Sequence, residues 1–296
     1  MTALVRIILL ATAAATLTFE SAQSPSSVLA SAMLISVTLL AMYLLQPGDR
    51  SFRTWTVYLL GFILFIHLRA LADKTGNPTR FDYVIHADQT LFMGVVPTVW
   101  LQQHFLSSTW LILFAMGVYA SYFLAPHAVA LALWRWRPER FQPFVAAFLA
   151  TCFLSLILHF LLPTAPPWLA AQLGDLPHVV RITDDVGHQI SAAAYQRGYA
   201  LADSNPVAAM PSLHMALTSL IAVIAWRAGD CWRILATLYA AAMLFSVIFL
   251  GEHYFTDALA GTFTALVGWQ LARAWAAQQL PVRREAKRFL SVPSTD

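Results

Sequence analysis

The chain has 296 residues, of which 59% are hydrophobic and only 11% are charged. Soluble proteins carry roughly 25% charged residues on average, so the composition argues strongly against an ordinary soluble globular protein. The formal net charge is only +3, and the basic residues are spread between hydrophobic segments. Because a nucleic-acid-binding protein gathers its basic residues on one face, the charge pattern argues against that class as well.

Uncharged stretches predict an all-α integral membrane protein with about eight transmembrane helices, each long enough to cross the hydrocarbon layer. The run from Gln89 to Trp134 is too long for one span, and Pro97 and Gln102 interrupt it, so its first part is expected to be re-entrant or interfacial. Cys152 and Cys231 are expected at different depths, without a disulfide. The expected spans lie near 4–19, 28–46, 54–69, 107–134, 141–162, 208–226, 234–250 and 254–274.

Basic residues indicate the orientation of these helices, because cytoplasmic loops are enriched in Lys and Arg. With both termini in the cytosol, only five of the 18 Lys and Arg residues fall outside: Arg69, Lys74, Arg80, Arg181 and Arg197. The long segments 70–106 and 163–207 then face outward, where a functional site is expected. The first span also resembles a signal peptide, and its removal would leave seven helices.

Two segments place ionisable groups beside apolar runs, where charge is costly and often functional. In MPSLHMA (210–216), Ser212 suits the first turn of a helix, whose free N–H groups form an anion site next to His214. In GEHYFTDALAG (251–261), His253 and Asp257 share one helix face if that helix begins by Glu252. A carboxylate in this place can fix the tautomer of the imidazole.

Other interpretations of these residues remain open from spacing alone. A histidine at the end of a membrane helix is often a snorkelling interfacial residue. The His253 and Asp257 pair is also compatible with an ordinary helix-surface pair, or with a zinc site completed by His214. The sequence offers no further ligand at a usual helical spacing, so no metal or other cofactor is expected.

The two motifs together resemble the type 2 phosphatidic acid phosphatase superfamily. PSLH is followed, 39 residues from histidine to histidine, by HYFTD. With TAPPW (164–168) and VVRITD (179–184), the chain is similar to the inositol phosphorylceramide synthase branch, which attaches phosphoinositol to a lipid alcohol. The resemblance covers residues 160–262 well, and it implies a six-helix phosphatase-like core with extra N-terminal helices.

The resemblance also implies a domain organisation and roles for residues. It implies N-terminal membrane helices (1–53), a catalytic membrane domain (54–276) and a cytosolic basic tail (277–296). His253, oriented by Asp257, would attack phosphorus and form a phosphohistidine, and His214 would serve as acid and then as base. Ser212 would bind the phosphate.

Phosphate ligands typical of the superfamily are missing. The arginine expected six residues before the second histidine is Val247, and the Arg137-Pro138 pair lacks its upstream lysine and is predicted to be cytosolic. Arg181, on the polar face of an amphipathic segment (178–194), is the expected replacement, although it is also placed to pair with Asp184 or Asp185. Arg69 and Asp73 either bind a headgroup or simply satisfy one another.

The expected function is therefore membrane-embedded phosphotransfer on a phospholipid or lipid phosphate, at the outer face of a bacterial plasma membrane. The favoured interpretation is a transferase, which moves a phospho-headgroup such as phosphoinositol to a polar or lipid alcohol acceptor. Water as acceptor would instead make the enzyme a lipid phosphate phosphatase of the phosphatidic acid or prenyl pyrophosphate type. A lipid-binding or transport protein with a degenerate site is the non-enzymatic alternative. No nucleic-acid partner is expected.

Overall fold

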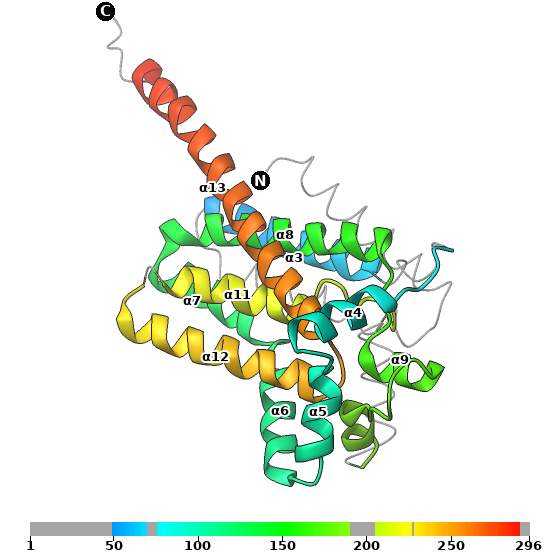
Figure 1. The fold of residues 1–296 in the computed structure, drawn as a ribbon. Coiled ribbons are helices and arrows are strands. Elements are labelled where there is room, and N and C mark those ends of the chain that lie inside the picture. The colour runs from blue at the N-terminus through cyan, green and yellow to red at the C-terminus, as the bar shows by residue number, and fades with distance from the viewer. Residues whose placement is uncertain (1–48, 70–75, 190–204, 227, 291–296) are drawn as a thin grey trace, which may run out of the picture. The chain divides into compact units, whose positions relative to one another are not determined.

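The computed structural model describes residues 49–69, 76–189, 205–226 and 228–290, and all regular elements in these ranges are helices (Figure 1). The all-α prediction is confirmed for this part of the chain. The expected spans at 4–19 and 28–46, and Asp73, lie outside the described residues. The helices are α3 (Asp49–Arg69), α4 (Asp82–Leu91), α5 (Pro97–Phe105), α6 (Thr109–Ser121), α7 (Ala125–Trp136), α8 (Pro138–Leu161), α9 (Pro167–Leu173), α11 (Leu213–Ala225), α12 (Asp230–Phe249) and α13 (Phe255–Leu290). Residues 182–189, within the segment expected to be an amphipathic helix, are helical as well.

Local sequence signals explain where several of these helices begin and end. α5, α8 and α9 start at prolines, whose fixed φ and missing N–H suit the first helical position. α9 ends at Gly174, which has a φ of 94° that other residues rarely adopt. α11 is N-capped by Ser212, whose hydroxyl accepts a hydrogen bond from the Met215 amide.

Two described helices, α8 and α12, are long and apolar enough to cross a membrane. The predicted span at 107–134 is not one straight helix, because α6 and α7 are bent by 49° at a short break. This bent pair makes a third candidate span if the two helices form one broken span. The helix that holds the last predicted span, α13, continues to Leu290, past the predicted membrane boundary near 274. The count of eight spans is not confirmed.

The described chain divides into two compact units, and all the elements from α4 onward that the site uses belong to the unit of residues 61–186 and 205–296. Within it, α13 packs against α8 and α11, and α11 packs against α12 (Figure 1). Met215, Met243, Val247 and Ala258 form a buried apolar cluster between α11, α12 and α13. This packing brings the start of α11 next to the start of α13, where the two sequence motifs lie.

Candidate active site

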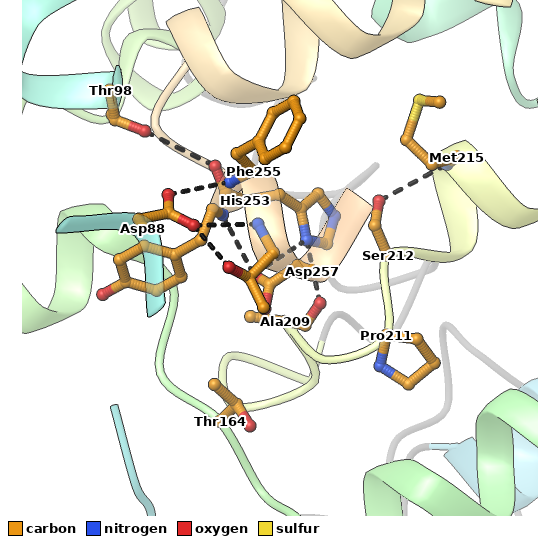
Figure 2. A network of polar contacts seen from close by, with 12 residues as sticks. Asp88, Thr98, Thr164, Ala209, Pro211, Ser212, Met215, His253, Phe255 and Asp257 are labelled. Atoms are coloured by element: carbon orange, nitrogen blue, oxygen red, sulfur yellow. Dashed lines mark hydrogen bonds and ion pairs between the residues drawn. The ribbon is translucent and has the colours of Figure 1, made fainter. Parts of the chain in front are cut away.

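His253 lies in the loop before α13, and its imidazole is buried among backbone groups (Figure 2). Nδ1 lies 2.9 Å from the Ala209 carbonyl oxygen and 3.7 Å from Asp257 Oδ2. Because a carbonyl oxygen only accepts, Nδ1 carries the proton, and Nε2 keeps its lone pair. The sequence assigned the fixing of this tautomer to Asp257, whereas the shorter contact is with Ala209.

The start of α13 differs from the expected one. The helix begins at Phe255 rather than by Glu252, so His253 precedes it, yet His253 and Asp257 still meet. Asp257 is fully buried, and its Oδ2 accepts a hydrogen bond from the Tyr254 amide at 3.0 Å. The carboxylate thus caps the start of α13, where a negative charge is favoured, and it also faces the imidazole of His253.

His214 is brought next to His253, with 5.6 Å between the ring centroids. It occupies the first turn of α11, directly after the Ser212 cap. The Ser212 amide donates to the Asp257 carbonyl oxygen at 3.0 Å, which ties the start of α11 to the start of α13. The structure therefore brings together the four residues that the two motifs supply.

The TAPPW segment supports Ala209, the partner of His253. Thr164 pairs with Ala208 in an isolated bridge, and its carbonyl oxygen accepts from the Ala209 amide at 3.1 Å. The Thr164 hydroxyl also lies 2.6 Å from the hydroxyl of Tyr83 in α4. A chain of contacts thus runs from α4 through Thr164 and Ala209 to His253.

Asp88 in α4 is a site residue that the sequence did not single out (Figure 2). It is fully buried, and its carboxylate accepts hydrogen bonds from the Phe255 amide at 3.0 Å and from both the amide and the hydroxyl of Thr256. Burial raises the pKa of the Asp88 carboxyl, and the donors from Thr256 and Phe255 act in the opposite direction. Asp88 thus caps α13 from another helix.

Arg181 forms an ion pair with Glu252, a partner that the sequence did not predict, with Nε 3.1 Å from Glu252 Oε1. Its guanidinium lies 4.4 Å from the centroid of the Trp168 ring, and the hydroxyl of Thr183 also donates to Glu252. Arg181 is therefore held beside the residue that precedes His253. Whether it binds phosphate stays a prediction.

The backbone next to Arg181 is fixed by Gln102 of α5. The Gln102 amide group donates to the carbonyl oxygens of Val180 and Phe249 and accepts from the Val180 amide, at distances of 2.8 to 2.9 Å. Gln102 is buried, and its place within a long apolar run was the signal that could have marked it. The sequence took it only as an interruption of a span.

Arg69 ends α3, and its carbonyl oxygen accepts from the Asn205 side chain. Its Nε is buried with no hydrogen-bond partner in the part of the chain that is described. The role of Arg69 as a headgroup ligand stays a prediction. His159 supports the site from α8, with Nε2 3.1 Å from the Pro211 carbonyl oxygen.

Comparisons with known proteins identify the family of the chain. The chain matches the PAP2 superfamily over residues 82–271, more than half of its length, and therefore belongs to that superfamily. It is also 28% identical over 241 residues to the phosphoinositol dihydroceramide synthase of Bacteroides thetaiotaomicron. The aligned region covers 73% of this chain and 76% of that protein. No solved structure gives a significant match. These findings confirm the predicted family and are consistent with its inositol phosphorylceramide synthase-like branch.

Proposed function

From its place in the PAP2 superfamily, an enzyme family of membrane lipid phosphatases and phosphotransferases, we propose that this enzyme moves a phospho-headgroup, such as phosphoinositol, from a phospholipid to a lipid alcohol. The observation that carries the proposal is the hydrogen bond from His253 Nδ1 to Ala209, which leaves Nε2 as a nucleophile beside His214. The relative's name supports phosphoinositol as the group that is transferred.

The reaction proceeds by two displacements at phosphorus. In the first, His253 Nε2 attacks the phosphorus, the bond to the leaving oxygen breaks, and His214 donates its proton to that oxygen. In the second, His214 takes a proton from the acceptor hydroxyl, the acceptor oxygen attacks phosphorus, and the bond to His253 breaks. Asp257 stabilises the imidazole of His253 while it carries positive charge.

The phosphate oxygens are held by cations and by helix N–H groups. Val247, at the position of the missing family arginine, is fully buried in the apolar cluster and is no ligand. Arg181 and Arg69 are the proposed cations, and Ser212 with the amides of Leu213 and His214 lies at the positive end of α11. Together these groups supply the charge stabilisation on which phosphoryl transfer depends.

The proposal places this site on the outer face of a bacterial plasma membrane, with both termini in the cytosol. It also retains a catalytic membrane domain over 54–276, N-terminal helices before it and a basic tail over 277–296. The lipid tails of the donor would remain in the hydrocarbon layer while its headgroup reaches the histidines at the starts of α11 and α13. Asp73 stays a candidate headgroup ligand that lies outside the described residues.

A product assay tests the proposal. Purified enzyme in detergent is incubated with headgroup-labelled phosphatidylinositol, with and without a ceramide-type lipid alcohol. A new phosphodiester that requires the alcohol supports transfer, whereas inositol phosphate formed equally in both samples would mean hydrolysis. We expect His253→Ala and His214→Ala to abolish turnover, because the first change removes the nucleophile and the second removes the acid and base. Residual activity near the wild-type rate in either variant would overturn the assigned roles.

A further inference from the structure

Two tyrosines pack directly against the imidazole of His214. The ring centroid of Tyr119 lies 4.3 Å from that of His214, with the planes at 24°, and the centroid of Tyr122 lies 4.1 Å away, with the planes at 40°. Tyr119 lies in the last turns of α6, and Tyr122 follows that helix at the break before α7. The break in the bent pair therefore lies at the level of the catalytic histidine.

The proposed first step needs His214 to be protonated, so the site has to stabilise a cationic imidazole at this place. His214 Nε2 is buried and has no hydrogen-bond partner among the described residues. No described acceptor thus stabilises the protonated ring through that nitrogen, although a buried charge is costly without a compensating partner.

An aromatic face is attracted to a cation that lies within about 6 Å of its centroid, and this attraction grows when the cation is desolvated. Both tyrosine rings satisfy this distance to His214. We infer that Tyr119 and Tyr122 form an aromatic clamp, which positions the His214 ring and favours its protonated form for the leaving-group step. The inference rests on the acid role that the proposed function gives to His214.

The clamp is anchored to the helical core. The Ser121 hydroxyl, which lies between the two tyrosines in sequence, donates to the Val118 carbonyl oxygen at 2.6 Å and lies 2.8 Å from the hydroxyl of Tyr239 in α12. Tyr119, Tyr122 and Tyr239 also belong to the partly buried residues that pack on the cluster around Met215. The tyrosines are therefore placed by packing between α6, α11 and α12, and a lost ring would free the imidazole to turn.

The test compares ring-removing and ring-keeping variants at each position. In Tyr119→Leu and Tyr122→Leu, we expect kcat to fall and the alkaline limb of the pH–rate profile to move to lower pH by about 0.5 to 1 pH unit, because the protonated acid loses a stabilising face. Tyr119→Phe and Tyr122→Phe keep the ring and are expected to retain the wild-type profile. Tyr→Met variants serve at either position if a leucine variant does not fold.

Each outcome decides the inference. Leucine variants with a uniformly lower rate and an unshifted pH profile would show that the tyrosines act only in packing, and would overturn it. Phenylalanine variants that shift as far as the leucine variants would assign the effect to the hydroxyls and would overturn it too. In both cases an inactive His214→Ala leaves the proposed function standing. An active His214→Ala would instead remove the acid role, and the clamp with it.

Discussion

The ion pair of Arg181 and Glu252 has two candidate uses, which are phosphate binding and a structural link between two segments. The guanidinium contacts Glu252, with Nε 3.1 Å from Oε1 and Nη2 3.5 Å from Oε2. The side chain of Arg181 remains 17% exposed. An arginine has five N–H donors in a planar fork that matches carboxylate and phosphate oxygens alike. Arg181 is thus placed to act as a positioned cation, and its pair with Glu252 links residues 179–183 to the loop before α13.

Substitution of each partner distinguishes these two uses. We expect Arg181→Ala to lower kcat/KM about 100-fold or more, which is the usual cost of a lost donor to a developing oxyanion. Glu252→Gln keeps an acceptor for Thr183 and for Arg181 while it removes the neutralising charge, so its kcat/KM should fall by less than about tenfold. Steady-state kinetics with Arg181→Lys as the charge-retaining control measures the contribution of the planar fork. Equal losses in Arg181→Ala and Glu252→Gln would mean that the pair acts only as a structural link.

At the scale of elements, the site depends on the close approach of α11 and α13. Gly261 of α13 faces the backbone of Ser212, and a Cβ at Gly261 would overlap the Ser212 carbonyl oxygen and lie 3.2 Å from the Ala216 amide. Backbone atoms have little freedom to move aside. The same stretch of α11 carries the Ser212 amide, which bonds to the Asp257 carbonyl oxygen.

Gly261→Ala should therefore separate the two helices and disturb both motifs at once. We expect a loss of about 1 to 3 kcal/mol in the free energy of unfolding, the usual cost of overpacking. We also expect kcat to fall in the fraction of the enzyme that remains folded, because both motifs are displaced. Gly117→Ala is the matched control, because a Cβ there meets no atom within 4 Å and alanine favours the helix. Thermal unfolding in detergent and turnover of both variants give the comparison. A Gly261→Ala enzyme with wild-type stability and turnover would contradict this account of the helix contact.

At the scale of the whole molecule, the sequence predicted what is local and missed what is remote. The Ser212 cap, the meeting of His253 with Asp257 and the helical class follow from short motifs and uncharged runs. The helix break at Tyr122 was missed because the residues from 107 to 134 carry no charge and were taken as one span, although Pro126 at the start of α7 marks a new helix. Asp88 was missed because its partners, Phe255 and Thr256, are far away in sequence. Such contacts depend on how the helices pack, which periodicity does not encode.

The orientation of the whole chain is open to a test with its own cysteines. Cys231 lies in the first turn of α12 and is exposed, whereas Cys152 of α8 is fully buried, so only Cys231 should react with a water-soluble maleimide. The positive-inside rule places this turn in the cytosol, next to Arg233, and places α4 outside. Asp82, at the start of α4, is exposed and suits a cysteine from the opposite side.

In intact spheroplasts, a membrane-impermeant maleimide should label Asp82→Cys but leave Cys231 unlabelled until the membrane is permeabilised. The membrane blocks the reagent from the cytosolic side, so the difference reports the side on which each residue lies. Cys231→Ser controls for the native thiol, and Asp82→Cys in that background isolates the outer signal. Labelling of Cys231 in intact spheroplasts, with Asp82→Cys protected, would invert the topology. The start of α13 and the histidines beside α4 would then face the cytosol, and the headgroup donor and acceptor would have to be sought there.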